Sequence, residues 1–132
     1  MSVRLLDSNI WIAISKSEPQ VVNTLRNFRP SQISTCAIVR AELIYGARKS
    51  QRVEENLAGM ERLLATFASL PFDDRAADYY GAIRALLERG GTPIGANDLL
   101  IAAIALAHDC ILVTRNTNEF QRVPGLRLED WK

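Results

Sequence analysis

The stretch Val3-Arg4-Leu5-Leu6-Asp7-Ser8-Asn9-Ile10-Trp11-Ile12-Ala13-Ile14 is the part of the chain most informative about the fold. Its first four residues predict a short strand, and the apolar run from Ile10 predicts the start of a helix. The three polar residues between them are all of types that cap helices. A strand that passes directly into a helix is typical of an α/β domain. Asp7 stands at the junction, where open parallel sheets bind ligands.

Strands and helices continue to alternate along the rest of the chain. The run Cys110-Ile111-Leu112-Val113-Thr114 is typical of a buried strand in the middle of a parallel sheet. Further strands are expected at 32–36 and 126–128, and 70–72 is either a short strand or a connector. Helices are expected at 19–28, 37–48, 53–69, 73–90 and 95–108. This order predicts a single α/β domain over residues 1–132, with a parallel sheet flanked by helices.

The composition limits the classes of function. With 132 residues, 48% of them hydrophobic, the chain is long enough to bury a core. The net charge of +1 excludes a polycationic domain, and 13 of the 16 basic residues are arginines, so a nucleic-acid site would be a local arginine cluster. Cys36 and Cys110 lie in apolar runs and are expected to be buried free thiols. We find neither a leader peptide nor a membrane-length apolar run and expect a cytoplasmic protein with no membrane partner.

Acidic and amide side chains interrupt apolar sequence in four separate places. Burying an isolated carboxylate costs several kcal/mol, so a chain that repeats this pattern has to compensate the charge. Where carboxylates have no evident basic partners, a divalent metal is the obvious compensator. The pattern therefore predicts a hard-metal site and phosphate chemistry, and its segments are Leu5–Asn9, Ala41–Leu43, Asn97–Leu99 and Thr114–Phe120.

The first two of these segments also allow structural explanations. Asp7 could simply cap the helix that follows it, although either of the next two residues could do the same. Glu42 could lie on a solvated helix face and pair with Arg40 or Arg48.

The other two segments have similar alternatives. Asp98 suits the first turn of its helix because a carboxylate there interacts favourably with the helix dipole, and Asn97 beside it could be the cap. The segment 114–120 could be an ordinary polar turn in which Glu119 pairs with a neighbouring arginine. Each of the four segments is weak evidence alone, and their placement together strengthens the prediction of a site.

Other catalytic arrangements are absent from the sequence. The single His108 cannot form a two-histidine acid–base nuclease, and no HExxH, CxxC, Walker, GxGxxG or GxSxG motif is present. A metal-dependent phosphohydrolase of the aspartyl-phosphate type is a possible alternative because Leu6-Asp7-Ser8-Asn9 crudely resembles its D-x-D motif. That chemistry needs a second aspartate where this chain has Asn9, and a suitably placed lysine.

The chain as a whole resembles the PIN-domain ribonucleases of the VapC toxin type. The resemblance covers essentially the full length, and its motifs are Leu5–Ile10, Ala41–Ala47, Pro93–Asp98, Thr114–Phe120 and Val123–Trp131. It implies a PIN fold with strand order 3-2-1-4-5 and an Mg²⁺- or Mn²⁺-dependent endoribonuclease inhibited by a VapB-type antitoxin. The ending Gly-Leu-x-x-Glu-Asp-Trp is similar to a subgroup that cuts tRNA, with the anticodon loop of initiator tRNA as one possible target.

The resemblance also implies the core residues of the site. Asp7, Glu42 and Asp98 match the three acids that hold the metal in the family. The wider family often has a fourth acid where this chain has Asn116, which we expect to take part in catalysis by positioning. The missing charge leaves a further alternative, in which a catalytically weak PIN scaffold only binds RNA or an antitoxin.

Further residues are candidates around this core. Ser8 replaces the threonine usual in the family and keeps its hydroxyl, and Glu119 could substitute for the missing fourth acid. Thr114, Arg115 and Arg122 are candidate contacts to the RNA phosphates.

Two protein partners are expected. Trp11, Ile12 and Ile14 on one helix, and the 57–64 region on another, offer more apolar surface than a small sheet needs to cover. We expect an antitoxin segment to lie in a groove between helices, and the chain itself to form a homodimer.

Overall fold

A five-stranded parallel sheet forms the centre of the computed structural model, which describes residues 2–132. The strand order is β3-β2-β1-β4-β5, and all four neighbouring pairs are parallel. This confirms the α/β class and the strand order that the resemblance implied. The strands are β1 (Arg4–Leu6), β2 (Ile33–Cys36), β3 (Ala68–Leu70), β4 (Ile111–Val113) and β5 (Leu128–Glu129).

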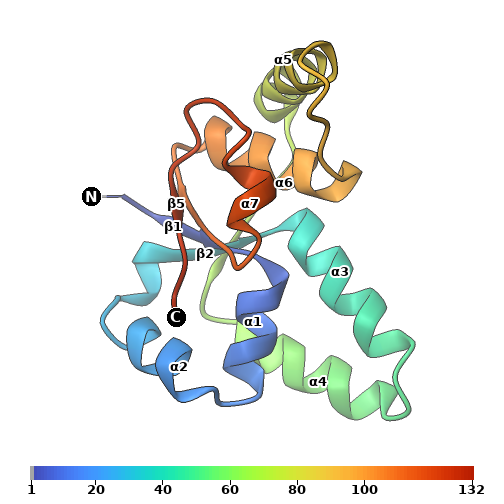
Figure 1. The fold of residues 1–132 in the computed structure, drawn as a ribbon. Helices are drawn as coiled ribbons and strands as arrows, with labels where there is room; N and C mark the ends of the chain where they lie inside the picture. The colour runs from blue at the N-terminus through green and yellow to red at the C-terminus, as the bar shows by residue number, and fades with distance from the viewer. Residues whose placement is uncertain (1) are drawn as a thin grey trace.

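Helices cover both faces of this sheet (Figure 1). In that view α1, α2 and α4 lie below the strands and α5 and α6 above them, while α3 leads away from the end of β2 and packs against α4. The helices are α1 (Ser8–Ser15), α2 (Pro19–Leu25), α3 (Ala37–Arg48), α4 (Val53–Leu64), α5 (Asp74–Arg89), α6 (Ala96–Ala107) and α7 (Thr117–Phe120), with a short 3-10 turn at Pro30–Gln32. None of the helices within residues 2–132 combines the length and the apolar character needed to cross a membrane.

Local sequence explains where most helices begin and end. Asp7 is the N-cap of α1, so the capping alternative for this residue is correct. Pro19 occupies the first turn of α2, where its missing N–H costs nothing. Asp73 caps α5 and accepts a hydrogen bond from the backbone N–H of Ala76 at 2.9 Å. Gly91, with φ +70°, follows the end of α5 in the left-handed conformation that glycine adopts without strain.

Two expectations about secondary structure were wrong. The helix predicted over 53–69 ends at Leu64, and Ala68–Leu70 forms β3 instead, paired in parallel with β2. The apolar residues in this stretch fit both a helix and a strand, and pairing with the sheet decides between them. The second is the ordinary polar turn that was the structural alternative for 114–120, because this segment contains the four-residue helix α7.

The core lies around the central strands and α6. Between Leu99 and Ala107 almost every side chain of α6 is buried, in agreement with its apolar sequence. Trp11 is also buried, and its indole N–H donates to the carbonyl of Leu6 at 3.0 Å. Cys36 and Cys110 are buried free thiols, as expected. Burial raises the pKa of the Cys36 thiol to about 11, so it is protonated and inert at neutral pH.

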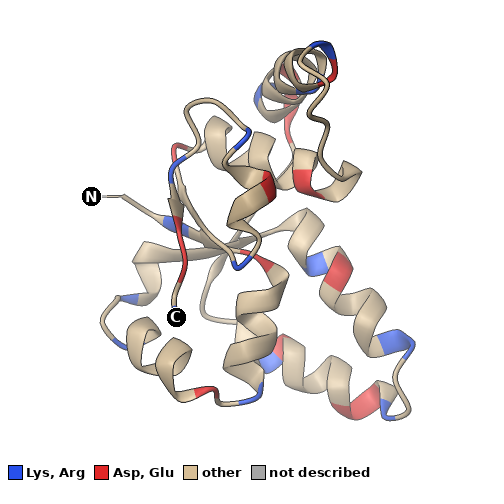
Figure 2. Ribbon diagram, in the orientation of Figure 1, with Lys and Arg blue, Asp and Glu red and all other residues tan. Residues whose placement is uncertain are grey.

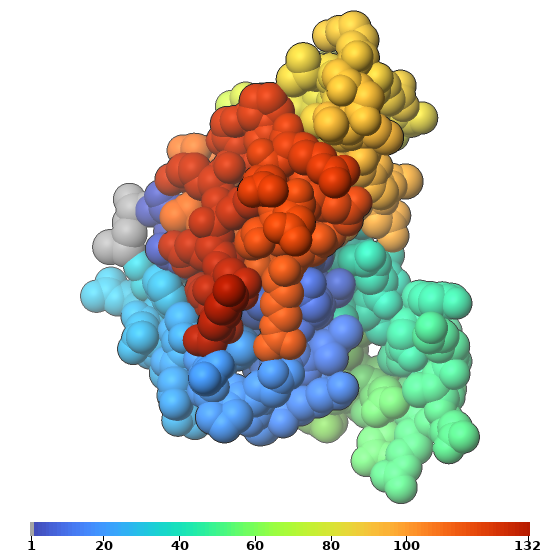
Figure 3. Space-filling view, in the orientation of Figure 1, coloured from blue at the N-terminus to red at the C-terminus, as the bar shows by residue number. Residues whose placement is uncertain are grey.

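A cluster of paired charges and stacked rings joins the first strand to the last, and we call Arg4, Phe28, Glu129 and Trp131 the terminal clamp. Arg4 donates to both carboxylate oxygens of Glu129, at 2.8 and 2.7 Å, and its guanidinium lies 4.5 Å from the centre of the Phe28 ring. Phe28 stacks on Trp131, whose indole N–H donates to Glu129 at 3.1 Å. Figure 3 shows the red C-terminal residues packed against the blue N-terminal part of the molecule.

Candidate active site

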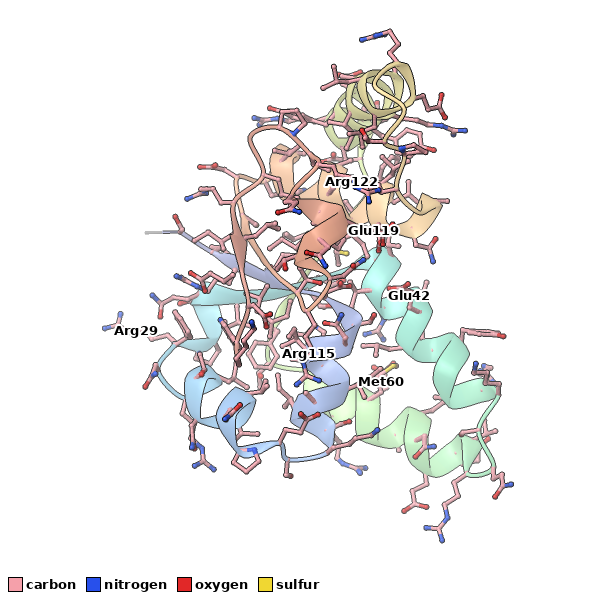
Figure 4. All side chains as sticks on the ribbon, viewed as in Figure 1. Arg29, Glu42, Met60, Arg115, Glu119 and Arg122 are labelled. Carbon is pink, nitrogen blue, oxygen red and sulfur yellow. The ribbon has the colours of Figure 1, made fainter. Side chains whose placement is uncertain are left out.

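Acidic side chains from four segments meet at one edge of the sheet, beyond the carboxyl ends of β1 and β4. Figure 2 shows acidic segments at the start of α1 and on α3, α6 and α7 grouped where these elements approach one another. Figure 4 shows Glu42 on α3 and Glu119 on α7 near one another at this edge. Ligands bind at the carboxyl ends of strands in open parallel sheets, so the fold places these acids where a site is expected.

Asp7 is the most buried of these acids. Its Oδ1 accepts from the backbone N–H of Ser8 at 2.8 Å, and its Oδ2 accepts from the hydroxyl of Thr114 at 2.8 Å. Burial raises the pKa of the Asp7 carboxyl, and these two hydrogen bonds oppose the effect only in part. The Asp7 carboxyl is therefore oriented by two neutral donors, and no basic side chain of the described residues forms an ion pair with it.

Asp98 lies half-buried in the first turn of α6, and its carboxylate accepts from the side-chain amide of Asn116 at 3.2 Å. Its pKa is raised to about 6, first by burial and then by the negative charges of Asp7, Glu119 and Glu42. This coupling places all four carboxylates in one electrostatic cluster. Burial and the neighbouring negative charges both favour the protonated form of Asp98.

Glu42 faces this cluster rather than forming a surface ion pair. Its Oε2 accepts a weak hydrogen bond from the Asn97 amide at 3.3 Å, and its Oε1 is buried without a hydrogen-bond partner. Arg40, which the sequence suggested as a partner, pairs instead with Glu61. A buried carboxylate oxygen left without a partner is costly, so this atom marks a position where a ligand would be stabilised.

Glu119 is held by an amide and forms no ion pair with the arginines next to it. Its carboxylate accepts from Asn116 at 2.6 Å, and this hydrogen bond is the main cause of its lowered pKa. Arg115 pairs with Glu18 at 2.8 Å, while the Arg122 guanidinium donates to a backbone carbonyl at 3.0 Å. The alternative in which Glu119 pairs with either arginine is therefore wrong.

None of the four acids takes part in an ion pair within residues 2–132, although eight ion pairs form elsewhere in that part of the chain. Their contacts come from neutral donors, namely hydroxyl, amide and backbone N–H groups. Carboxylate oxygens without a basic partner, one of them buried and without a hydrogen bond, are suitable ligands for a hard divalent cation. As arranged here, no three Asp, Glu, His or Cys side chains of the described residues are close enough to hold an ion, so a bound cation would draw them together.

Comparison with known proteins assigns the family. The sequence profile of the PIN domain matches residues 4–126. The chain belongs to the VapC family of PIN-domain proteins. It is 43% identical over 127 residues to the tRNA(fMet)-specific endonuclease VapC of Shigella flexneri and 41% identical over 127 residues to that of Salmonella typhimurium, with 96% of each chain covered. The crystal structure of DNA-bound VapBC from Salmonella typhimurium contains a chain that matches over the full length of both, with a TM-score of 0.92 and 40% identity.

The PIN fold changes the role expected of Thr114. Its side chain is 0% exposed and its hydroxyl donates to Asp7, so it cannot reach an RNA phosphate and instead positions a carboxylate. Arg115 and Arg122 are exposed, as an RNA contact requires; Arg122 lies near enough to Glu119 to lower its pKa, whereas Arg115 pairs with Glu18. Ser8 is partly exposed at the start of α1, directly after Asp7.

Asn97 is a site residue of this PIN domain that sequence reasoning missed. We considered it only as a helix cap, but Gly95 caps α6 and Asn97 reaches across to Glu42. Its position beside Asp98 in the first turn was the only available signal. The contact itself spans 55 residues of sequence, which no local pattern reveals.

A hollow of about 430 Å³ opens beside Glu42, between α3 and the first turn of α6. It is lined by Ile38, Ala41, Tyr45 and Asn97 as well as by Glu42. Tyr45 is 65% exposed, the most exposed of the large hydrophobic side chains among the described residues. The PIN domain therefore has apolar surface directly next to its acidic cluster.

Proposed function

We propose that the chain hydrolyses phosphodiester bonds of RNA at the edge where Asp7, Glu42, Asp98 and Glu119 meet, with Mg²⁺ or Mn²⁺ as cofactor. The observation that carries this proposal is the electrostatic cluster of four carboxylates without a basic partner. Endoribonuclease activity is in keeping with the VapC family. The metal and the individual roles of the residues are our inference from the contacts.

Each acid has a distinct task in this proposal. Asp7, Glu42 and Asp98 would hold the cation, and Glu119 would supply the fourth carboxylate that the position of Asn116 lacks. A bound divalent cation would lower the pKa of water and offset the negative charge that develops on the phosphate. The protein orients Asp7 in advance through Ser8 and Thr114, while Glu42 keeps one oxygen free for the ligand.

The contacts weaken the two alternatives considered from the sequence. The inactive scaffold rested on the missing acid at Asn116, and Glu119 beside it restores the number of carboxylates to four. The aspartyl-phosphate mechanism needs a lysine close to Asp7, but no lysine of residues 2–132 bonds to that carboxylate. Metal-dependent cleavage of RNA is the better explanation.

We propose a folded tRNA as the substrate. The relatives from Shigella flexneri and Salmonella typhimurium are named for tRNA(fMet), and this chain is more than 40% identical to each. Initiator tRNA, cut in its anticodon loop, is the first substrate to test. Arg115 and Arg122 would contact its backbone, and such a substrate places the protein in the cytoplasm.

We also propose a VapB-type antitoxin and a second copy of this chain as partners. The related chain from Salmonella typhimurium was solved as VapBC. Trp11 is buried and cannot contribute to the antitoxin surface, which corrects our expectation, whereas Ile12 on the same helix is 44% exposed. A basic antitoxin side chain would neutralise the unpaired acids. Tyr45 on α3 and Leu86 on α5 are exposed apolar residues that a homodimer would cover.

Cleavage of a tRNA pool by the purified protein tests the proposal. We expect Mg²⁺ or Mn²⁺ to support cleavage, EDTA to abolish it, and co-expression of a VapB-type antitoxin to suppress it. Glu61→Gln is the matched control, because Glu61 is a paired glutamate on the exposed face of α4. Cleavage that continues unchanged in excess EDTA would overturn the role of the metal.

A further inference from the structure

The turn after β4 contacts three of the four acids through neutral groups. The buried hydroxyl of Thr114 donates to Asp7 at 2.8 Å and accepts from the backbone N–H of Asn116 at 3.0 Å. This hydroxyl therefore uses its single proton on the carboxylate and a lone pair on the turn. The backbone of Asn116 is thereby tied to the orientation of Asp7.

The side chain of Asn116 continues this chain of hydrogen bonds. Its Nδ2 donates to Asp98 at 3.2 Å and to Glu119 at 2.6 Å. Two ionised carboxylates accept hydrogen bonds but cannot donate them, so the amide nitrogen rather than the oxygen has to face them. In this orientation Asn116 offers the cluster two protons and no metal-binding oxygen.

We propose that the Thr114–Asn116 turn is a neutral brace that sets the positions of Asp7, Asp98 and Glu119, and that Asn116 is a positioning residue rather than a metal ligand. This inference rests on the proposed metal-dependent function. It assigns to the position of the family's fourth acid a different task in this chain. Glu119 carries the fourth negative charge instead, and the side-chain amide of Asn116 holds the Glu119 carboxylate next to Asp98.

Neutral donors suit this task for an electrostatic reason. An arginine or lysine in the same place would neutralise the acids and compete with a cation for them. Hydroxyl and amide protons orient the carboxylates and lessen their repulsion, but they leave the net negative charge in place for a metal. A carboxylate at position 116 would add a charge to a cluster that already raises the pKa of Asp98.

The first test compares Asn116→Asp with Asn118→Asp, which adds the same charge two residues further along on an exposed residue of α7. Without metal, we expect Asn116→Asp to lower the melting temperature by roughly 2–8 °C relative to Asn118→Asp, because it replaces a donor with a like charge. Mg²⁺ should then raise the melting temperature of Asn116→Asp more than that of Asn118→Asp. Equal melting temperatures of the two variants with and without Mg²⁺ would overturn the brace.

The second test compares Thr114→Val, Thr114→Ser and Thr35→Val. Thr35 is a matched control, because it is a buried threonine on strand β2 of the same sheet, and its hydroxyl has no hydrogen-bond partner. We expect Thr114→Val to weaken Mg²⁺ binding, measured by calorimetry, by about tenfold or more, as for loss of a group that orients a metal ligand. Thr114→Ser keeps the hydroxyl and should restore the affinity, and Thr35→Val should bind like the unaltered protein.

The outcomes separate the brace from the function on which it rests. Failure of the unaltered protein to bind Mg²⁺ would overturn the proposed function, and the brace with it. If the unaltered protein binds Mg²⁺ and Thr114→Val binds equally well, only the brace is overturned. Should Thr114→Val fail to fold, Asn116→Ala decides, because it removes the side-chain amide that donates to Asp98 and Glu119 at the partly exposed N-cap of α7. A loss of Mg²⁺ affinity of about tenfold supports the brace, and unchanged affinity overturns it.

Discussion

Glu119 in α7 and Glu129 in β5 are both partly exposed, but their electrostatic surroundings are opposite. In the terminal clamp, Glu129 receives two hydrogen bonds from Arg4 and one from Trp131, so its charge is fully compensated. In the acidic cluster, Glu119 forms no ion pair; its main hydrogen bond comes from the neutral amide of Asn116, and it lies next to the like charge of Asp98. Paired carboxylates stabilise the fold, whereas carboxylates without a counter-ion store repulsion that a cation can relieve.

The largest effect is expected from neutralising one of the acids in the acidic cluster, which have no counter-ion. Asp7→Asn or Asp98→Asn removes a ligand charge and nearly keeps the shape, so RNA cleavage should fall at least about 100-fold. The fold should persist, and the metal-free protein should become more stable by about 1 kcal/mol because one repelling charge is gone. Cleavage assays and thermal melts in EDTA measure the two effects. Wild-type cleavage by either variant would remove that residue from the site.

Neutralising Glu129 in the terminal clamp should have the opposite result, a loss of stability with little change in cleavage. Glu129→Gln leaves Arg4 without its carboxylate and should destabilise the protein by about 1–2 kcal/mol, a moderate value because both side chains are partly exposed. Cleavage per folded molecule should change little at low temperature. Chemical denaturation gives the loss of stability, and a variant more stable than the parent would contradict the comparison.

The pH dependence of stability should also distinguish the terminal clamp from the acidic cluster. Arg4 holds the pKa of Glu129 below its ordinary value of 4.5, so the carboxylate form favours the folded state. Its contribution is fully present above pH 4.5 and is lost as the pH falls through the lowered folded pKa. The difference in melting temperature between the parent and Glu129→Gln should therefore shrink on acidification from pH 7 to about pH 3. A difference that stays constant over this range would exclude the ion pair as its source.

The smallest effect is expected from the exposed arginine beside the site. Arg115→Ala removes one proposed phosphate contact and should raise KM for tRNA by about threefold to tenfold at low salt, with kcat nearly unchanged. Glu18→Gln frees Arg115 from its exposed ion pair and should alter stability by less than about 1 kcal/mol. Steady-state kinetics at two salt concentrations provide the measurement, and a fall in kcat alone would assign Arg115 to the chemistry instead.

Local patterns predicted the elements that local chemistry determines. The helices expected to begin near residues 19, 73 and 95 are present as α2, α5 and α6, because nearby residues determine where they start. Strand β3 could not be separated from the preceding helix, because Ala68–Leu70 has no clear alternation and depends on pairing with β2. The strand order came from the resemblance to a known family rather than from periodicity.

The candidate site, like the fold, could be predicted from the sequence only in part. Asp7 and the 114–120 segment follow apolar strands, so their meeting at one edge could be predicted from the rule for parallel sheets. The contact between Thr114 and Asp7 spans 107 residues, and the sequence offered only a polar side chain that suggested a phosphate contact. Which neutral group bonds to which acid depends on side-chain geometry, which no local sequence pattern gives.

The terminal clamp also has a consequence for the timing of synthesis on the ribosome. Arg4 and Glu129 are 125 residues apart, and β5 pairs with β4 just before the turn that contains Thr114. The backbone N–H of Thr114 itself donates to the carbonyl of Glu129 at 3.0 Å. A growing chain cannot form these contacts until residues 128–131 have left the exit tunnel. The acidic edge is therefore completed only after residues 128–131 have been translated and released from the tunnel, which delays the appearance of a ribonuclease next to the ribosome that makes it.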